Sequence, residues 1–259
     1  IGEPMVSIII PNCEQKDVLE KCINSIRDKS TYRNYEILIV ENNSSSKEIF
    51  DYYKTLEADP RIKVISWANA FNYSAINNFG AEHASGDYLL LLNNDTEVIA
   101  ADWMEQLLQF AMREDVGCVG AKLLYTDGHI QHAGVIIGFR GIAAHSFCRQ
   151  PGDFHGYMNR AIVAQNVSAV TAACLMVKKS NFDAVGGLDE SFVVAYNDID
   201  FCLKIRELGK FNVFNPGALL YHHESLSRGY EDTPEKLARF EAEVARFQSK
   251  WASVLAAGD

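Results

Sequence analysis

Carboxylate and amide side chains stand directly after three apolar segments of this 259-residue chain, at places where the strands of a sheet would end. Asp95 follows the most apolar of these segments, residues 88–92, in the sequence Asn93-Asn94-Asp95. A carboxylate at that place could hold Mg²⁺ or Mn²⁺, which would bridge it to a diphosphate. The alternative is structural, because capping of the next helix by Asp95 or Thr96 is the commoner use of such residues.

Two further clusters contain side chains that could do chemistry. Asp198 and Asp200 lie at the start of an expected helix, where an acid either compensates the helix dipole, contributing about 0.3–1 kcal/mol, or acts as a general base toward a substrate hydroxyl. His222 and His223 follow an expected strand at residues 218–221. Because neighbouring residues of a strand face opposite sides, we expect at most one histidine to bind a metal; the alternative is that both pack at the strand end.

Apolar periodicity places these clusters on alternating strands and helices. Strands are expected at residues 6–10, 36–40, 62–67, 88–92 and 117–125, with helices at 18–26, 47–56, 73–84 and 103–111. This alternation predicts an α/β fold, with a mostly parallel sheet covered by helices on both faces. Ligands of such sheets bind beyond the carboxyl ends of the strands, where Pro11 and Glu41 also lie.

The second half of the chain is less regular. A turn at Asp127-Gly128 precedes a hairpin-like segment at 130–139, and the irregular stretch 140–165 is typical of a functional loop or lid. A strand at 170–177, a helix at 197–208 and a helix starting at Thr233-Pro234 follow. Without an internal repeat or a clear linker, we expect one domain, and its start close to the first strand is consistent with a domain cut from a longer chain.

Composition excludes several classes of protein. A hydrophobic fraction of 48% argues against wholesale disorder. The 34 acidic residues outnumber 24 basic ones, and a net charge of -10 argues against nucleic acid or an anionic membrane surface as the main partner. No transmembrane segment or signal peptide is expected. The six cysteines have no metal-binding spacing, which predicts reduced core cysteines in a cytoplasmic protein.

Familiar nucleotide-binding and hydrolase motifs are missing from the sequence. No G-x-G-x-x-G follows the first strand, and no G-x-x-x-x-G-K-[ST] occurs, which argues against a dinucleotide-binding Rossmann enzyme and against a P-loop. The sequence also lacks the G-x-S-x-G elbow of α/β-hydrolases.

The order of the motifs resembles that of the inverting family 2 glycosyltransferases of the GT-A fold, over nearly the whole chain. The similarity begins with VSIIIPNCEQ from Val6, EILIVENNSSS from Glu36 and ASGDYLLLLNNDTEV from Ala84. It continues with AVTAACLMVKKSNFDAVGGLDESF from Ala169, YNDIDFCLKIRELGK from Tyr196 and LLYHHESLSRG from Leu219. The most similar branch builds bacterial surface polysaccharides and includes rhamnosyl- and galactofuranosyl-transferases.

The resemblance implies roles for particular residues. Asp198 matches the catalytic base of the family, and Asp95 keeps the last acid of its D-x-D motif, so that metal affinity would be reduced. His222 is similar to a histidine that completes the metal site in several members. Glu41 stands where the family usually has an Asp that contacts the base or ribose. The expected nucleotide-binding residues are Pro11, Glu41, Asn43, Asn77, Asn94, Asp95 and Arg228, and the expected metal ligands are Asp95 and His222.

Two of these residues have equally simple structural readings. Arg228 could clasp the diphosphate from a flexible loop or be a solvated surface arginine, and Asn77 could face the nucleotide or be a solvated helix residue. The resemblance also implies a GT-A fold whose nucleotide-binding half is about residues 1–125 and whose smaller, mixed acceptor and catalytic half is about 126–259.

The implied function is metal-dependent transfer of a sugar in surface-polysaccharide synthesis, with inversion at the anomeric carbon. The donor would be a UDP- or dTDP-linked sugar, the acceptor a glycan or lipid-linked glycan, and the cofactor Mn²⁺ or Mg²⁺. The implied location is the cytoplasm, with room for peripheral contact at the inner face of the membrane.

Two alternatives compete with this reading. A sugar-nucleotide pyrophosphorylase would carry a Gly-rich basic loop after the first strand, whereas PNCEQKD contains no glycine. A catalytically inactive glycan- or nucleotide-binding module gains weight from Asn93 and Asn94, which replace acids. Intact Asp95, Asp198 and His222 argue against it.

Overall fold

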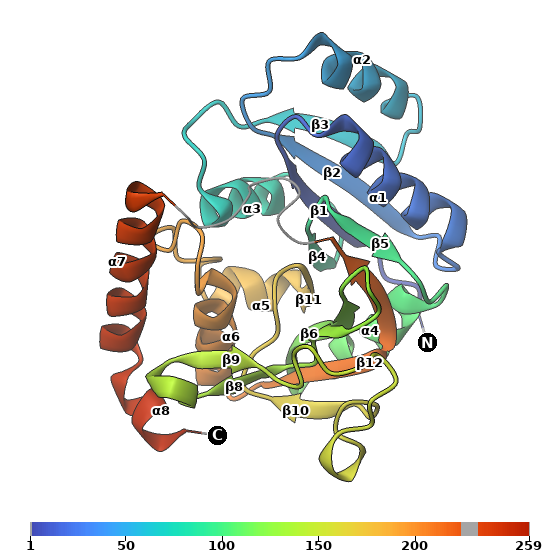
Figure 1. The fold of residues 1–259 in the computed structure, drawn as a ribbon. Helices are drawn as coiled ribbons and strands as arrows, with labels where there is room; N and C mark the ends of the chain where they lie inside the picture. The colour runs from blue at the N-terminus through green and yellow to red at the C-terminus, as the bar shows by residue number, and fades with distance from the viewer. Residues whose placement is uncertain (1, 224–232, 259) are drawn as a thin grey trace.

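The computed structural model describes residues 2–223 and 233–258, and a ten-stranded mixed sheet runs through them (Figure 1). Its strands are β1 (Val6–Asn12), β2 (Tyr35–Glu41), β3 (Ile62–Ser66), β4 (Tyr88–Leu92), β5 (Thr96–Val98), β6 (Val116–Leu124), β7 (Ile130–His132), β10 (Gln165–Val167), β11 (Cys174–Lys178) and β12 (Phe211–His222). A separate two-stranded sheet pairs β8 (Val135–Ile137) with β9 (Ala143–His145).

The strand order is β10-β12-β6-β11-β4-β1-β2-β3, with β5 added to β12 and β7 to β6. Along this path β3, β2, β1, β4, β6 and β12 run in one direction, while β11 and β10 run in the other. The predicted α/β class with a mostly parallel central sheet is therefore confirmed. Because β6 pairs with both β11 and β12, the sheet continues without a break from the first half of the chain into the second.

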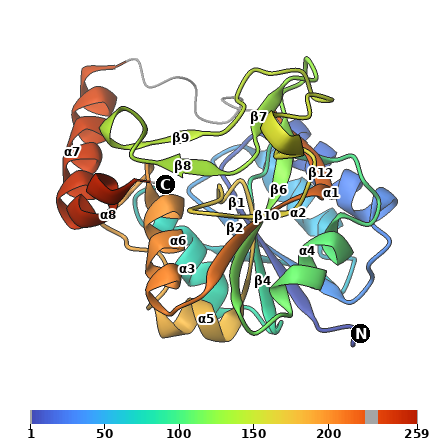
Figure 2. The ribbon, with the colours of Figure 1, turned by 90° about the horizontal axis from the view of Figure 1, so that it is seen from below.

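Helices cover both faces of the sheet, as the view in Figure 2 shows. They are α1 (Lys16–Lys29), α2 (Lys47–Leu56), α3 (Tyr73–Glu82), α4 (Trp103–Ala111), α5 (Lys179–Ala184), α6 (Asn197–Glu207), α7 (Pro234–Lys250) and α8 (Ala252–Ala257), with short 3-10 turns at η1 (Phe139–Gly141) and η2 (Tyr157–Asn159). No helix in the described part of the chain combines the length and the apolarity needed to cross a bilayer.

Alternate residues of the central strands belong to two separate cores. Ile8 and Ile10 of β1 pack in the core that includes Leu19 of α1 and Trp103 of α4. Ile9, between them, packs in the opposite core with Ile76 of α3 and with residues of α6 and α7. Strands that are buried on both faces read as continuous apolar runs, which is why the sequence predicts them well.

Three expectations about strands need correction. The strand expected at 170–177 begins only at Cys174, and residues 171–173 form a loop instead, with Cys174 N–H donating to the Thr171 carbonyl at 3.3 Å. The strand expected at 218–221 is the end of the longer β12, whose register shifts between Asn215 and Leu219. The hairpin expected within 130–139 is divided, because β7 pairs with β6 and β8 with β9.

Candidate active site

A cavity of about 520 Å³ opens where β1 and β4 end, between α3 and the start of α6. The residues that line it are Pro11, Asn12, Cys13, Glu14, Gln15, Asn42, Phe71, Tyr73, Ile76, Asn93, Asn94, Thr171, Ala172, Ala173, Val194, Asn197 and Asp198. They come from strand ends and loops of both halves of the chain, as expected for a ligand site of an open α/β sheet.

Asp198 reaches this cavity from the first turn of α6 and is half-buried. Its Oδ2 accepts a hydrogen bond from Ala172 N–H at 3.1 Å, and its Oδ1 accepts one from Ile199 N–H at 2.8 Å. The carbonyl of Ala172 accepts a hydrogen bond from the Tyr73 hydroxyl at 3.1 Å, so the backbone of Ala172 joins α3 to Asp198. A carboxylate has about four lone-pair sites, and two of them remain for a substrate proton.

Asp95 and His222 lie together and contact the cavity through Asn93, which lines it. The Asp95 Oδ1 atom is 3.1 Å from His222 Nε2, and the side chains are 4% and 11% exposed. The short strand β5 causes this contact, because it pairs antiparallel with the end of β12 and places Thr96 opposite His222. Asp95 therefore precedes a strand, and the helix-cap alternative is wrong: the next helix, α4, starts at Trp103 with Asp102 before it.

The hydrogen bonds of His222 indicate what the pair could bind. Its Nδ1 lies 2.6 Å from the Gln131 Oε1 atom and so carries the ring proton, which leaves a lone pair on Nε2. That lone pair faces Asn93 Nδ2 at 3.1 Å and Asp95 Oδ1, a buried oxygen with no hydrogen-bond partner among the described residues. A carboxylate and an imidazole whose other nitrogen donates to an oxygen are typical ligands of a divalent transition metal.

Further ligands for such a metal would have to come from a bound molecule. Within residues 2–223 and 233–258, no group of three or more His, Cys, Asp and Glu side chains is arranged to hold a metal ion. Asp95 and His222 thus fit a cation whose remaining ligands are oxygen atoms of a diphosphate or of water.

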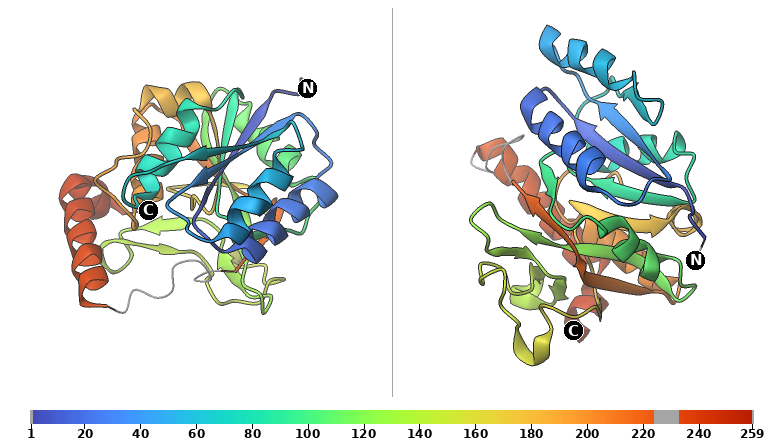
Figure 3. Two further views of the ribbon diagram at one scale, coloured as in Figure 1. Left: turned by 90° about the horizontal axis from the view of Figure 1, so that it is seen from above. Right: turned by 90° about the vertical axis from the view of Figure 1, so that its right-hand side faces the viewer.

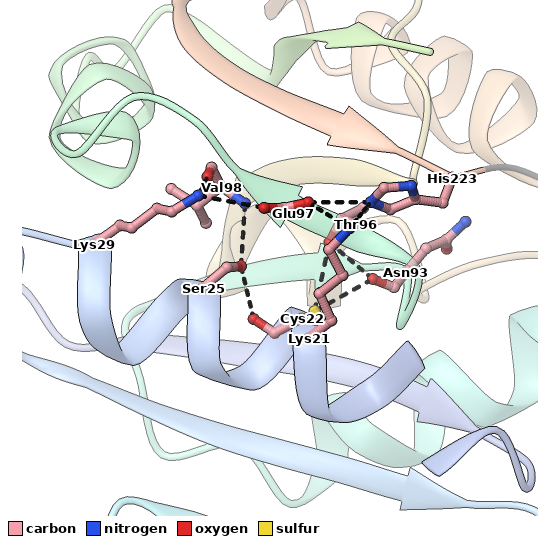
Figure 4. A network of polar contacts seen from close by, with 9 residues as sticks. All are labelled: Lys21, Cys22, Ser25, Lys29, Asn93, Thr96, Glu97, Val98 and His223. Carbon is pink, nitrogen blue, oxygen red and sulfur yellow. Dashed lines mark hydrogen bonds and ion pairs between the residues drawn. The ribbon is translucent and has the colours of Figure 1, made fainter. Parts of the chain in front are cut away.

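The His223 ring faces Glu97 and Lys21, as Figure 4 shows. Its Nε2 lies 3.3 Å from the Glu97 Oε2 atom and 3.3 Å from Lys21 Nζ. Lys21 also forms an ion pair with Glu97 at 2.8 Å. The His223 ring is therefore part of a network between α1 and β5. Its backbone N–H donates to the Asp95 carbonyl at 2.9 Å, but its ring nitrogen faces Glu97 and Lys21 and not the Asp95 carboxylate.

Asp200, the next acid along α6 after Asp198, is turned away from the cavity and is completely buried. Its Oδ1 accepts a hydrogen bond from Trp251 Nε1 at 2.8 Å and pairs with Lys250 Nζ at 2.7 Å. Asp200 thus anchors α6 to α7 and has no access to a substrate in the cavity.

Glu41 is 4% exposed and is not among the residues that line the cavity. Its carboxylate accepts hydrogen bonds from the Ser44 hydroxyl at 2.7 Å and from the Tyr53 hydroxyl. Burial and this contact with Glu41 raise the pKa of Tyr53. Tyr53 in turn accepts a hydrogen bond from Asn12 Nδ2 at 2.8 Å, so Glu41 supports the cavity wall through its neighbours.

Glu14 holds the loop after β1 against the loop after β2. Its carboxylate accepts hydrogen bonds from the Ser45 hydroxyl at 2.9 Å and from the N–H and hydroxyl of Ser46. The Ser46 hydroxyl first, and then the Ser45 contacts, lower the pKa of Glu14 to about 2.

This lowered pKa predicts a local acid transition. Because the folded-state pKa lies below the ordinary value of 4.5, Glu14 contributes stability that is present above that pH and is lost as the pH falls toward about 2. We expect the Glu14 carboxyl carbon to titrate near pH 2 by NMR, and the Ser45 and Ser46 amide signals to move with it. In Glu14→Gln that movement should disappear; a Glu14 titration near 4.5 would show that the contact does not hold in solution.

The remaining predicted nucleotide-binding residues have different surroundings. Pro11 and Asn94 line the cavity, and Asn94 Nδ2 donates to Asn12 Oδ1 at 2.7 Å. Asn43 is exposed with φ 58° and donates to the Asn69 carbonyl at 2.8 Å, outside the cavity lining. Asn77 is completely buried and donates to the Tyr73 carbonyl at 2.8 Å, so it is not the solvated residue of the alternative reading. Arg228 lies outside the described residues.

Several residues of the site were not predicted from the sequence. Tyr73, Asn42 and the loop at 171–173 line the cavity, and Gln131 orients His222. Asn42 stands beside Glu41 in a polar segment after a strand, so its position was a usable signal. Gln131 comes from a three-residue strand with no distinguishing pattern.

Comparison with known proteins identifies the family. The Glycosyl transferase family 2 model matches residues 7–186. "Uncharacterized protein y4gI" of Sinorhizobium fredii (strain NBRC 101917 / NGR234) is 49% identical over 252 residues, covering 96% of this chain and 28% of that protein. "O-antigen biosynthesis protein RfbC" of Myxococcus xanthus is 39% identical over 235 residues, covering 90% of this chain and 18% of that protein. The chain thus spans less than a third of the length of these relatives.

Among solved structures, the mannosyltransferase PcManGT from Pyrobaculum calidifontis, in complex with GDP-Man and Mn²⁺, is similar to this chain with a TM-score of 0.68. The sequences are 15% identical, and the match covers 99% of this chain and 69% of that one. At this identity the likeness shows the fold, which is the GT-A fold expected from the motifs. With the family match over residues 7–186, the chain belongs to glycosyl transferase family 2.

Proposed function

We propose that this domain is an inverting, metal-dependent glycosyltransferase that acts in surface-polysaccharide synthesis. It would move a hexosyl or deoxyhexosyl group from a nucleoside-diphosphate sugar to a hydroxyl of a glycan or lipid-linked glycan. One observation carries the proposal: Asp198 lines the same cavity as Asn93, whose amide contacts the Asp95–His222 pair. The proposed general base, Asp198, and the proposed cation-binding pair, Asp95 and His222, therefore belong to one site.

Asp198 is the proposed general base. The acceptor hydroxyl would enter the cavity and give its proton to a free lone pair of the carboxylate as its oxygen attacks the anomeric carbon. The hydrogen bonds from Ala172 and Ile199 hold that carboxylate in place without consuming all its acceptor sites. Attack from the side opposite the leaving diphosphate inverts the anomeric carbon.

Asp95 and His222 are proposed to hold the divalent cation, Mn²⁺ or Mg²⁺, which when bound stabilises the negative charge of the leaving diphosphate. Gln131 keeps the His222 ring oriented through Nδ1, and Asn93 lies between the pair and the cavity. Pro11 and Asn94 remain proposed contacts of the nucleotide, because they line the cavity next to Asn12. The role of Arg228 stays a prediction.

The donor base and the acceptor follow from similarity rather than from the geometry of the site. The motifs favour a UDP- or dTDP-linked sugar, and the similar PcManGT structure contains GDP-Man. A relative named for O-antigen biosynthesis supports a polysaccharide or lipid-linked glycan as the acceptor. The cytoplasm, with contact at the inner membrane face, stays the predicted location.

A nucleotide screen tests this proposal directly. The protein is melted with UDP, dTDP or GDP, each with Mn²⁺, with Mg²⁺ or with a chelator. A nucleotide at about 100 times its dissociation constant should add about 2.7 kcal/mol to the free energy of unfolding, and the chelator should remove that gain. Stabilisation that does not depend on the metal would contradict the metal-dependent part of the proposal.

The reaction product separates the proposal from its alternatives. Incubation with the donor found in the screen and a glycan acceptor should give a glycoside and release the nucleoside diphosphate. A catalytically inactive module would bind the nucleotide without hydrolysing or transferring the donor. Formation of a nucleotide sugar from a sugar phosphate would indicate pyrophosphorylase chemistry instead.

Glu41 provides a further prediction about nucleotide binding. Replacing it with alanine removes the acceptor of the Tyr53 and Ser44 hydrogen bonds and leaves the buried Tyr53 hydroxyl without that acceptor. We expect the free energy of unfolding to fall by about 1–3 kcal/mol. The nucleotide affinity should also fall, more than kcat does, since Asn12 depends on Tyr53. Urea unfolding and nucleotide titration measure the two effects.

The matched control is Glu48→Ala, an exposed glutamate in the first turn of α2. It should change neither quantity appreciably. If Glu41→Ala lowers stability but leaves the nucleotide affinity unchanged, Glu41 supports the fold alone and does not take part in binding.

A further inference from the structure

Glu243, in the middle of α7, has a carboxylate that is 2% exposed and is bound by three consecutive backbone amides. Its Oε1 accepts hydrogen bonds from Val193 N–H at 2.6 Å and from Val194 N–H at 2.9 Å. Its Oε2 accepts one from Ala195 N–H at 3.0 Å. A buried carboxylate is costly unless it is hydrogen-bonded, and bonds from amides to an ionised acceptor are among the strong ones.

The bound segment, residues 193–195, leads directly into α6 and the proposed base. Its other side is held by α3, since Tyr73 N–H donates to the Val193 carbonyl at 2.9 Å. Asn197 Nδ2 donates to the Val194 carbonyl at 2.8 Å. Val194, Asn197 and Asp198 all line the cavity, so a shift of this segment would move the cavity wall.

The backbone between this segment and α6 is strained. Tyr196 has φ 63° and ψ 2°, a left-handed conformation that is uncommon for an aromatic residue and persists only where its surroundings enforce it. The Tyr196 ring stacks on Phe247 of α7 at 5.1 Å between centroids and an angle of 27°. Glu243 and Phe247, one turn apart on the same helix, thus hold the segment before this bend and the bend residue Tyr196 itself.

We propose that Glu243 is a positioning residue that places Asp198 in the cavity from α7. This inference rests on the proposed function of Asp198. Helix α7 forms one edge of the molecule, on the side away from α2 (Figure 3). Its residues lie beyond residues 7–186, the segment matched by the family model. Through Glu243 this helix determines the position at which α6 starts, and with it the distance from Asp198 to an acceptor hydroxyl.

The test replaces Glu243 with glutamine, which keeps the shape of the side chain. The amide has one acceptor oxygen, and its NH₂ group would face an N–H of residues 193–195. We expect kcat to fall by about 10–100-fold, because small misplacements of reacting groups have effects of that size. The KM for the donor and the affinity for the nucleotide with Mn²⁺ should stay unchanged. Glu241→Gln, an exposed glutamate of the same helix, is the matched control and should have no effect.

Combining variants distinguishes positioning from a general structural role. In an Asp198→Asn background, Glu243→Gln should lower the residual kcat no further, because the group it positions is already lost. If the fold-losses of kcat in the two single variants multiply in the double variant, the proposal is overturned. An unchanged kcat in Glu243→Gln alone would overturn it too. If both Glu243→Gln and Glu243→Asp unfold at the assay temperature, Glu243 serves stability as a whole and the proposal is also overturned.

Hydrogen exchange separates this proposal from the proposed function itself. The amides of Val193, Val194 and Ala195 should be protected in the unmodified protein and exchange faster in Glu243→Gln, with or without activity. If this exchange is seen but Asp198→Asn keeps full transfer, the assignment of the base fails while the hold of Glu243 on the segment stands. Unchanged exchange in a folded Glu243→Gln would overturn the positioning role whatever the kinetics of Asp198→Asn.

Discussion

Replacing Asp198 with asparagine is expected to lower kcat by about 10²–10⁴-fold, the usual contribution of a general base. The amide keeps the shape of the side chain, and its oxygen can retain one of the hydrogen bonds from Ala172 and Ile199. An amide does not take up the proton of the acceptor hydroxyl, so the loss belongs to the chemical step. Steady-state kinetics with the donor and acceptor should show the loss in kcat, and nucleotide titration should show unchanged binding.

The structure makes this variant unusually informative, because few other carboxylates could replace Asp198. Among the described residues, Glu14 is the other acid that lines the cavity, and its oxygens are bound by Ser45 and Ser46. Asp183→Asn, an exposed position on α5, is the matched control and should keep full activity. Transfer within a few-fold of normal by Asp198→Asn would remove it from the role of base.

Removal of either proposed metal ligand is expected to abolish most of the metal-dependent binding of nucleotide. Loss of groups that merely orient a ligand typically weakens metal affinity by about 10–100-fold, so His222→Ala or Asp95→Asn should cost at least that much. A 100-fold weaker complex would reduce the stabilisation by nucleotide and Mn²⁺ from about 2.7 to about 0.4 kcal/mol at the same ligand concentration. Thermal unfolding with and without Mn²⁺ measures the change.

His223→Ala is the matched control for this pair of variants. The two histidines are adjacent and buried to a similar degree, with side chains 11% and 12% exposed, but the His223 ring contacts Glu97 of β5 and not the Asp95 carboxylate. Its removal should leave the metal-dependent stabilisation close to that of the unmodified protein. If His223→Ala weakens Mn²⁺-dependent binding and His222→Ala does not, the assignment of the metal site is wrong.

The local elements of this protein could be predicted from its sequence, because each leaves a pattern within a few turns of chain. The strands around Ile8, Leu38 and Leu90 are buried on both faces, and they appear as continuous apolar runs. Polar residues then stand where those runs stop, and the topology of an open sheet brings such ends to one edge. The α/β class and the position of the cavity follow from these two facts. The place of Asp198 at a helix start follows from the helix expected at residues 197–208.

Contacts between distant segments had no such local pattern. Asp95 meets His222 because the three-residue strand β5 pairs with β12, and a strand that short leaves no periodicity to detect. Glu41 and Asp200 look in the sequence like the other acids near strand ends and helix starts. In the fold, Tyr53 packs against Glu41 and Lys250 packs against Asp200, and both acids are buried away from the cavity.

The sequence by itself therefore determined which elements form and which residues stand at their ends, since both depend on neighbours along the chain. The tertiary structure alone decided which of those residues face one another. Glu243 shows the difference: in the sequence it is one of several glutamates on an amphipathic helix, and in the fold it binds the amides of residues 193–195. The side on which such a helix packs depends on the order of strands across the whole sheet, which no local pattern records.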